Sequence, residues 1–374
     1  MTRLVLVGGG HAHALVLESL ISQPEPGLSI TLVAKEAQAP YSGMLPGHVA
    51  GFYAAEEVHI DAARLSERAG ARFVHDAVTR VDAAARTVTL ACGETLGWDL
   101  LSLDVGITPD LALIEGAAEH GISVKPVSTF APKWAALAEG ARSADGPHRI
   151  AVVGGGAAGF ELILAARTRL RGDAADKGGD PDRFAFTLIA GGGLLEGFPE
   201  GARRRARRAL DGAGVTLIEH DFAAAVGPDA VQLVSGRRVA ADAALMTTKA
   251  KPADWFVASG LPRAPDGFLA LDETLRVSGH ERIFAAGDCA TSLVHPRPKA
   301  GVFAVRQAPA LADNLRRAAR GEAPRPFRPQ RRWLSILSTA DGSAIAARAP
   351  FVAEGRWVWR WKDRIDRRFM ARFD

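Results

Sequence analysis

Cysteine is nearly absent from this chain of 374 residues. Its two cysteines, Cys92 and Cys289, lie far apart, and neither belongs to a CxxC motif or a Cys/His cluster. This pattern argues against a disulfide framework, a zinc site and a local dithiol redox pair, so we predict no metal. Any chemistry carried out by this protein is therefore expected to proceed without a thiol.

Long hydrophobic runs are absent as well. No apolar segment approaches the roughly 18 residues that a membrane-spanning helix needs. The apolar run at residues 4–7 follows one arginine and is interrupted at once by three glycines, which is typical of a buried strand and not of a signal peptide. We expect a cytoplasmic protein, with peripheral contact to the cytoplasmic membrane face as an open alternative.

Excess charge is concentrated at the end of the chain. The net charge is +4, from 46 Lys and Arg against 42 Asp and Glu. Residues 325–374 carry twelve basic and five acidic side chains, net +7, which leaves −3 for the rest. Nucleic-acid binding would rest on this tail alone, and we predict no nucleic-acid partner. The length and the 48% hydrophobic content exclude disorder and allow two or three domains.

A strand–turn–helix–strand pattern occurs twice. Its first copy places these elements at residues 4–7, 8–10, 13–22 and 29–33. Its second copy places them at residues 150–153, 154–159, 160–170 and 184–189. The pattern is that of the βαβ nucleotide-binding unit, so the chain is predicted to be α/β with two Rossmann-like domains.

Other segments are predicted from their periodicity. Strands are expected at residues 72–81, 87–90, 99–103, 215–219, 230–233, 243–246 and 283–286. Residues 171–183, rich in Gly and Asp, predict a solvated loop, residues 203–210 a helix with a basic solvent face, and residues 302–317 a further helix.

The tail has its own aromatic pattern. Trp357, Trp359 and Trp361 alternate with other residues, which predicts a strand, and the basic residues after them predict a helix to Phe373. We interpret this small α+β module as packed on the first domain. Aromatic and basic residues together are also typical of a membrane interface, and this alternative stays open.

The glycine turns suit a dinucleotide, because GxGxxG lets the backbone approach a pyrophosphate and aims a helix N-terminus at it. The first turn has His13 at the third glycine position, whereas the second is complete to Gly159. The strand that follows each turn lacks the usual acid that binds the ribose at its end. In the first unit, Lys35 or Glu36 would have to bind the ribose instead. The missing acids weaken the prediction of tight NAD binding.

Four elements in order resemble the two-dinucleotide flavoprotein family of glutathione reductase and type II NADH dehydrogenase. They are the two glycine turns, the strand that leads to Gly106, and a late apolar strand that ends at Gly287 and Asp288. The resemblance implies FAD, with Asp288 at its ribityl and phosphate part. Capping of the following turn is the alternative role for Asp288.

The resemblance can be narrowed by short motifs. The loop Tyr-Ser-Gly-Met-Leu-Pro-Gly at 41–47 stands where disulfide reductases carry their redox cysteines, and it resembles the loop of type II NADH dehydrogenases and sulfide:quinone reductases. Together with residues 9–13, 299–307 and 361–369, it resembles the flavoprotein domain fused to, or encoded beside, selenophosphate synthase. This likeness covers essentially the whole chain.

The resemblance implies a domain organisation and an activity. An FAD-binding domain at 1–120 and 265–325, an NAD(P)-binding domain at 121–264 and the module at 326–374 are expected. NADH or NADPH would pass electrons through FAD to a quinone or small molecule, with a link to selenium metabolism and selenophosphate synthase as a partner. A flavin-binding partner or sensor with little turnover is the alternative. Sulfide:quinone chemistry is disfavoured because it needs cysteines beside the flavin.

The same resemblance assigns site residues. Those expected to contact the flavin are Gly8, Gly10, His11, His13, Ala14, Lys35, Glu36, Tyr41, Gly43, Met44, Leu45, Pro46, Val78, Gly106, Gly287, Asp288, Gly301 and Val302. Those expected to hold the nicotinamide cofactor are Gly154, Gly156 and Gly159. The amides at 301–302 open a helix and are expected to stabilise negative charge on the flavin.

Glu161 and Lys299 are the expected catalytic residues. Related quinone reductases place a carboxylate near the flavin at the position of Glu161, which implies a proton relay, but an early helical glutamate is equally favoured by the helix dipole. Lys299 is expected at the flavin edge or on the surface. His11 and His13 are either proton donors or simply hydrogen-bonded, and Tyr41 and Met44 pack on the flavin or within their loop.

Overall fold

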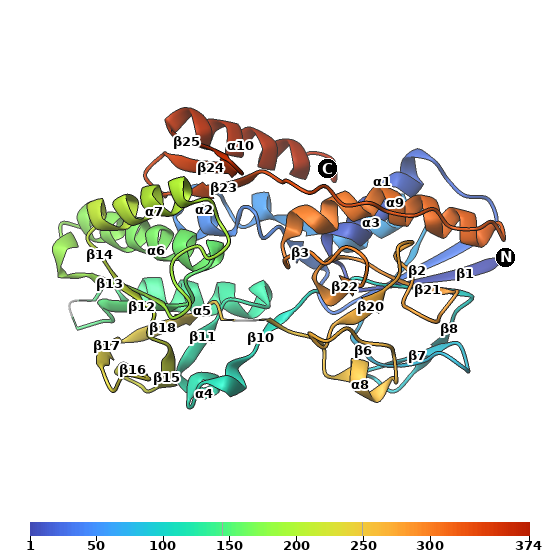
Figure 1. Cartoon of the computed structure of the whole chain (residues 1–374), viewed down its shortest axis with the longest axis horizontal. Helices are drawn as coiled ribbons and strands as arrows, with labels where there is room; N and C mark the ends of the chain where they lie inside the picture. Colours follow the sequence, from blue (N-terminus) through green and yellow to red (C-terminus); the bar gives the residue numbers. More distant parts are fainter. Residues whose placement is uncertain (144, 249) are drawn as a thin grey trace.

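The computed structural model describes residues 1–143, 145–248 and 250–374. Two α/β bodies lie side by side, and the C-terminal segment runs along one side of both (Figure 1). Antiparallel strands β10, Thr108–Pro109, and β19, Ala250–Lys251, pair where the chain passes between the bodies. The predicted fold class, α/β with two Rossmann-like domains, is confirmed.

The first sheet has five parallel strands in the order β21-β9-β1-β2-β5. They are β1 Thr2–Val7, β2 Leu28–Ala34, β5 Arg72–His75, β9 Leu100–Leu103 and β21 Ile283–Ala285. Helices α1 His11–Ser22, α3 Ala62–Arg68 and α9 Gly301–Ala319 lie above this sheet in Figure 1. Strands β6 Val78–Asp82, β7 Thr87–Leu90 and β8 Thr95–Gly97 lie below it. Cover on both faces explains why the central strands are continuous apolar runs.

The second sheet repeats this arrangement, with parallel strands in the order β11-β18-β12-β13-β14. They are β11 Gly121–Ser123, β12 Arg149–Val153, β13 Ala185–Ala190, β14 Val215–Glu219 and β18 Ala243–Met246. Its helices are α4 Ala117–His120, α5 Val127–Gly140, α6 Ala157–Asp176 and α7 Glu200–Gly212. An antiparallel sheet of β15 Ala223–Val226, β16 Ala230–Leu233 and β17 Arg238–Ala240 completes this body.

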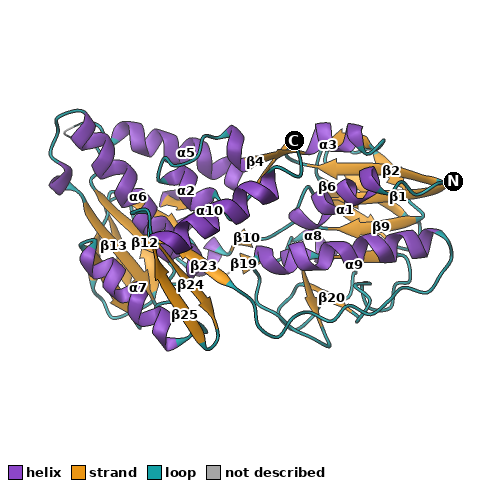
Figure 2. Cartoon of the chain, turned by 90° about the horizontal axis from the view of Figure 1, so that it is seen from above, coloured by secondary structure: helices purple, strands orange, loops and turns teal. Residues whose placement is uncertain are grey.

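Short elements connect the two bodies and line their edges. They are β3 Gln38–Pro40, α2 Leu45–Val49, β4 His59–Asp61, α8 Trp255–Ala258, β20 Leu269–Leu271 and β22 Ala290–Ser292. The tail forms an antiparallel sheet of β23 Ser335–Ser338, β24 Ala344–Arg348 and β25 Phe351–Gly355, followed by helix α10, Arg356–Met370. Figure 2 shows α10 running from this sheet toward α3.

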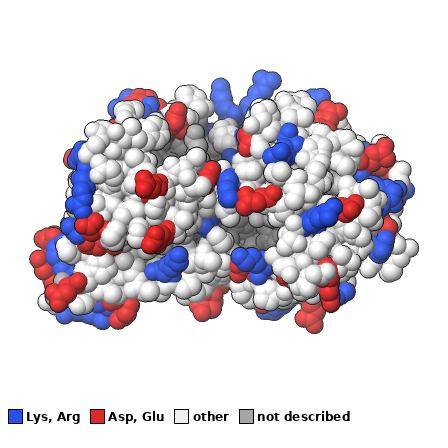
Figure 3. Space-filling view, turned by 90° about the horizontal axis from the view of Figure 1, so that it is seen from below, with Lys and Arg blue, Asp and Glu red and all other residues white. Residues whose placement is uncertain are grey.

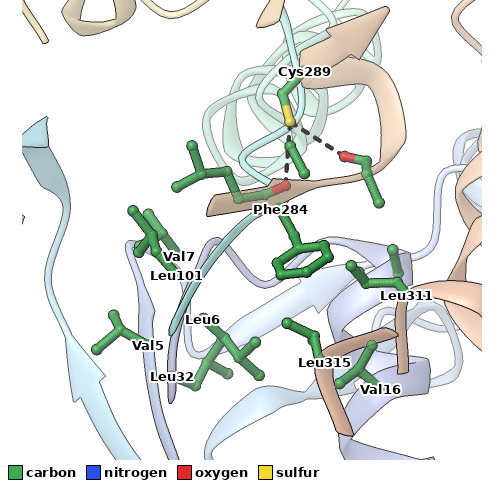
Figure 4. Packing of buried hydrophobic residues seen from close by; sticks show 14 of the residues in the cluster. Val5, Leu6, Val7, Val16, Leu32, Leu101, Phe284, Cys289, Leu311 and Leu315 are labelled. Carbon is green, nitrogen blue, oxygen red and sulfur yellow. Dashed lines mark hydrogen bonds between the residues drawn. The ribbon is translucent and has the colours of Figure 1, made fainter. Parts of the chain in front are cut away.

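The first core joins strand side chains to α1 and α9 (Figure 4). Phe284, on β21, is fully buried and lies near Leu311 and Leu315 of α9. Cys289 is buried in the same core, and its Sγ donates weakly to the carbonyls of Ala286 and Leu103, at 3.2 and 3.5 Å. This cysteine is therefore a small packing residue, as is typical of buried free thiols.

Three sequence predictions of secondary structure are wrong. Residues 72–81 form two strands, because the chain leaves the first sheet after His75 and joins a separate antiparallel sheet at Val78. The predicted loop at 171–183 is helical to Asp176, where α6 carries buried Ala174 on its inner face. Glycines at 178 and 179 then end the helix.

The tryptophan strand is also wrong, because Trp357, Trp359 and Trp361 lie on helix α10. Trp357 and Trp361, four residues apart, stack with ring centroids 6.4 Å apart on the exposed face. Trp359 points the other way, with its ring 5.9 Å from that of Phe52. The three tryptophans are spaced two and four residues apart, so their spacing fits both a strand and a helix. Ion pairs between residues four apart along α10 favour the helix.

The domain limits at 120, 264 and 325 stay a prediction. Phe256 and Leu261, assigned from the sequence to the second domain, pack in the first core cluster. No helix in the described part of the chain combines the length and the apolarity needed to cross a bilayer. On the face shown in Figure 3, basic and acidic side chains are interspersed.

Candidate functional site

The candidate site lies at the carboxyl ends of β1, β9 and β21, where α1 and α9 both begin. Strand order reverses here, which is where doubly wound α/β proteins bind ligands. A Cβ on Gly301, the first residue of α9, would lie 3.9 Å from His11 Nδ1 at the start of α1. Two helix N-termini, each with a partial positive charge, therefore meet beside His11.

A buried aspartate, which the sequence interpretation missed, organises the first glycine turn. Asp104, directly after β9, is 3% exposed, and its Oδ2 accepts hydrogen bonds from the amides of Ala12, at 2.9 Å, and His13, at 3.1 Å. A side chain on Gly10 would overlap this carboxyl group, and a Cβ on Gly287 would lie 2.5 Å from Oδ1. Both predicted cofactor glycines are thus required by Asp104 itself.

His13 is held inside the turn. Its Nδ1 lies 2.7 Å from the carbonyl oxygen of Gly8 and its Nε2 lies 2.8 Å from Ser102 Oγ. Burial lowers the pKa of His13 to about 4, so the imidazole is neutral at pH 7. These bonds explain why a histidine replaces the third glycine, and they favour the hydrogen-bonded alternative over proton donation.

His11 has an unused polar atom. Its buried Nε2 has no hydrogen-bond partner among the described residues, and its ring makes edge contacts to Tyr41, 5.3 Å away, and Phe369, 6.2 Å away. Burial lowers the pKa of His11 to about 4, with a smaller opposing effect of Asp288. Lys125 Nζ lies 3.5 Å from Asp288 Oδ2, so an anion here would meet both charges.

The loop at 41–47 is fastened by the C-terminal helix. Tyr41 donates to Asp366 Oδ1 at 3.0 Å, and its ring stacks on Phe369 at 4.6 Å. Lys362 Nζ donates at 2.6 Å both to the Gly43 carbonyl and to Asp366. Burial, reinforced by Asp366, raises the pKa of Tyr41. Hydrogen bonds from α10 therefore hold the loop in which disulfide reductases carry their cysteines.

The remaining residues of this loop face inward. Met44 is 1% exposed and packs with Tyr53 and Val58, and Leu45 lies in the core of the second body. Pro46 lies in the first turn of α2. This placement favours loop packing for Met44.

Glu161, on α6, faces the tail sheet. Its half-buried side chain accepts a hydrogen bond at Oε1 from the Ser338 amide at 2.8 Å. Burial raises the pKa of Glu161 to about 7, and the nearby ammonium of Lys362 opposes this shift. A carboxyl group of this kind exchanges a proton near neutrality, and its role as a relay stays a prediction.

Lys299 is bound within the first body. Its ammonium donates to the Ala290 carbonyl at 2.6 Å and to Thr291 Oγ1 at 2.7 Å, and lies 3.9 Å from the centre of the Phe268 ring. Burial lowers the pKa of Lys299. It lines a small hollow together with Asp288 and other residues, and its place at the flavin edge stays a prediction.

Other predicted flavin contacts are spread around this edge. Glu36 Oε1 accepts from Ser128 Oγ at 2.6 Å, and the Lys35 carbonyl lies 3.0 Å from His75 Nε2. Ala14 and Val78 are buried. Gly106 has a φ of +70°, which favours glycine, and a Cβ there would meet no atom within 4 Å. Val302 is the second residue of α9. Their cofactor contacts stay predictions.

The second glycine turn leaves space open at one of its glycines. Side chains on Gly154, Gly155 and Gly159 would overlap Thr247, Ala190 and the Gly154 carbonyl, respectively. A Cβ on Gly156 would meet nothing within 4 Å. Three glycines of this turn serve packing, whereas the fourth leaves open space at the N-terminus of α6.

Two acids lie near the end of β13. Glu196 Oε2 is 3.1 Å from the position of a Cβ on Gly192. Glu219, at the end of the neighbouring strand β14, pairs with Arg207 at 2.9 Å and accepts from the Leu194 amide at 2.8 Å. Arg207, by its hydrogen bond, lowers the pKa of Glu219. This carboxylate is therefore already committed to holding the loop after β13.

These features define a class of protein with two dinucleotide sites. The orphaned Nε2 of His11 and the two helix N-termini beside it fit a flavin dinucleotide, and the open Gly156 fits the pyrophosphate of a second one. The family model for pyridine nucleotide-disulphide oxidoreductases matches residues 2–309, and the chain belongs to that family. It is an FAD-binding oxidoreductase, with NAD(P)H as the expected co-substrate.

Individual relatives resemble the chain over most of its length. The type II NADH:quinone oxidoreductase of Staphylococcus aureus (strain NCTC 8325 / PS 47) is 24% identical over 377 residues, covering 94% of this chain and 91% of the relative. The sulfide:quinone oxidoreductase of Aquifex aeolicus matches in structure with a TM-score of 0.83 and 19% identity, covering 100% of this chain and 91% of that one. NDH2 from Plasmodium falciparum in complex with NADH matches with a TM-score of 0.83 and 14% identity, covering 100% of this chain and 97% of that one.

The two adjacent glycines 155 and 156 offer a test of the second site. Gly156→Ala should fold normally and weaken NADH binding by about tenfold or more, because the new methyl group occupies the space left for the pyrophosphate. Gly155→Ala should instead lower stability by about 1–3 kcal/mol through its clash with Ala190. Titration calorimetry and urea unfolding measure the two effects. Unchanged NADH affinity in Gly156→Ala would contradict this assignment.

Proposed function

We propose that the protein is an NAD(P)H dehydrogenase that passes electrons through FAD to a quinone or another small-molecule acceptor without a redox disulfide. The observation that carries the proposal is the loop at 41–47, which hydrogen bonds from Lys362 and to Asp366 hold in place of a disulfide. The two free cysteines do not replace it, because Cys92 is exposed and Cys289 is buried in the first core. The quinone acceptor is further supported by the name of the Staphylococcus aureus relative.

Bound FAD supplies two-electron chemistry to which NAD(P)H gives a hydride. Residues of this chain that would hold FAD are the turn at 8–11, Asp288 and the first residues of α9. The open turn at Gly156 would hold the pyrophosphate of the nicotinamide cofactor. Glu161, with Lys362 close enough to affect its pKa, would hold and release a proton beside the loop that carries Tyr41.

A flavin-binding sensor with little turnover is the alternative. The missing ribose acids at both second strands favour it, whereas the open Gly156 favours the dehydrogenase. The proposed link to selenium metabolism, with selenophosphate synthase as a partner, is supported by the sequence motifs alone. A selenium species therefore belongs among the acceptors to be tried.

The dehydrogenase can be tested on the flavin absorption. Anaerobic addition of NADH or NADPH should bleach the flavin absorption band at about 450 nm. A soluble quinone should then restore this band faster than selenite does. Bound flavin that neither donor bleaches would contradict the dehydrogenase and support the sensor. Restoration by selenite alone would contradict the quinone acceptor.

Glu161→Gln tests the proton relay. Because burial raises the pKa of Glu161 to about 7, its protonated fraction falls as the pH rises through that value. Quinone reduction by the unaltered protein should fall with it, while the variant should lose this step and slow by roughly 100-fold, with bleaching by NADH unchanged. Glu139→Gln, at an exposed position of α5, is the matched control. An unaltered pH profile in Glu161→Gln would rule the relay out.

We also propose peripheral membrane contact through α10. Trp357, Trp361 and Ile365 share the outer face of this helix and are 58%, 41% and 41% exposed. Four exposed arginines follow the same four-residue spacing beside them, at 356, 360, 364 and 368. An amphipathic helix with aromatic and basic residues suits an anionic bilayer surface. Val358 and Phe369 pack on the protein at the same time, so the two interpretations of the tail are compatible.

Point substitutions test this contact better than removal of the tail, since the tail holds Glu161 and Tyr41. Trp357→Ala with Trp361→Ala should lose most of the sedimentation with anionic vesicles, because two interfacial aromatics are removed. The control is Leu113→Ala with Val234→Ala, two exposed positions far from α10. Equal pelleting of both variants, or no pelleting of the unaltered protein, would refute the contact.

A further inference from the structure

The two halves of the chain place different side chains at one equivalent position. Asp104 follows β9 and donates its amide to the Val7 carbonyl at 2.8 Å, while Thr247 follows β18 and donates its amide to the Val153 carbonyl at 2.9 Å. In each half the glycine after that carbonyl, Gly8 or Gly154, packs against this residue. The two positions are therefore counterparts in the two nucleotide-binding units.

The side chains of Asp104 and Thr247 differ in how they interact with the helix that follows each glycine turn. Thr247 Oγ1 donates to the carbonyls of Val153 and Gly154, at 3.0 and 3.3 Å, and among the described residues it accepts no hydrogen bond from the amides of α6. Asp104 instead accepts hydrogen bonds from the amides of Ala12 and His13, the donors that a helix N-terminus offers to an anion. In the first half, a carboxyl group of the protein thus already occupies part of the anion site.

The second carboxyl oxygen of Asp104 is not used in the same way. Among the described residues, Oδ1 accepts no hydrogen bond, and it lies between Gly10 of the first glycine turn and Gly287, 2.5 Å from the position of a Cβ on Gly287. A diphosphate that binds at these turns brings two further negative charges to a buried carboxyl group. Acidic groups of like charge at a buried site cannot all stay ionised without a large cost in free energy.

We propose that Asp104 is a cofactor-binding residue that carries a proton in the FAD complex and donates a hydrogen bond from Oδ1 to a phosphate oxygen. When Asp104 is ionised in the free protein, it takes up one proton from solvent as FAD binds. Oδ2 keeps its two bonds to α1, so the turn needs no rearrangement. Asp104, for which Gly8, Gly10 and Gly287 make room, thereby becomes part of the diphosphate site.

Titratable and charged groups surround Asp104. The groups that face it from the neighbouring elements are His11 and His13 of α1, Asp288 and Cys289 after β21, and Lys125 beside Asp288. Burial raises the pKa of Asp104 to about 7, against two amide hydrogen bonds that lower it. Burial lowers the pKa of both histidines to about 4 and raises that of Cys289 to about 12.

The test is FAD titration of the full-length apoprotein from about pH 6 to about pH 9. Because binding takes up a proton, the Kd should rise by up to about tenfold per pH unit above about pH 7. Asp104→Asn keeps an acceptor for α1 and supplies a permanent N–H donor, so its Kd should stay nearly constant. Asp99→Asn, in an exposed ion pair with Arg3 just before the same strand, is the control and should keep the slope.

A second measurement does not depend on the variant. Calorimetry of FAD binding in buffers of different ionisation enthalpy should show uptake of about one proton near pH 8.5 and almost none near pH 6. Asp104→Thr, which copies Thr247, should abolish this uptake. FAD binding without proton uptake, or an Asp104→Asn variant with the original slope, would overturn the proposal alone. Absence of FAD binding at every pH would overturn the flavin site as well.

Discussion

The carboxyl group of Asp104 at the amino end of α1 is the contact on which the first nucleotide-binding unit depends. It joins β9 to α1 through two amide hydrogen bonds, and the turn glycines must lack side chains to admit it. Removing such a buried acceptor would leave two amides unpaired at a cost of about 1–3 kcal/mol each. The glycines of this motif are therefore required by the protein's own packing as well as by a ligand.

A second constraint acts on the loop at 41–47. In this chain, α10 holds the loop at 41–47 through Lys362 and Asp366, and Lys362 also bears on the ionisation of Glu161. One lysine thus couples the loop beside His11 to a carboxyl group in the other body. Helix α10 also carries the exposed tryptophans. A displacement of this helix would therefore affect both the loop and Glu161 through the Lys362 ammonium group.

Periodicity alone predicted the architecture well where strands are buried on both faces. Strand β18, which is buried throughout, appears at its predicted bounds because an apolar run between turn residues has few other options. The bounds of the less buried strands β14 and β16 were also predicted correctly. The tail was mispredicted since tryptophans two residues apart fit a strand, while the helical ion pairs and the stack of Trp357 on Trp361 depend on residues four apart.

The site was less predictable than the fold. Asp104, Lys362 and Asp366 act on residues about 90 to 320 positions away, and a single sequence carries no record of such pairings. One signal was present: His13 stands where a third glycine is expected, which indicates that the turn has partners of its own. His13 and Asp104 are in fact hydrogen-bonded to each other, through the His13 amide.

The internal repeat separates what the fold requires from what a ligand requires. Both units need a residue that pairs with β1 or β12 and packs on the first glycine of the turn, and Asp104 and Thr247 both meet that need. Only the choice of side chain differs. The hydroxyl group bonds to the Val153 carbonyl on the neighbouring strand β12 and, among the described residues, leaves the helix amides of the second unit without a side-chain acceptor, which suits a co-substrate that must bind and leave in each turnover. The carboxyl group binds the helix amides of the first unit, so the anion site is shaped before any ligand arrives, which suits a cofactor that stays bound.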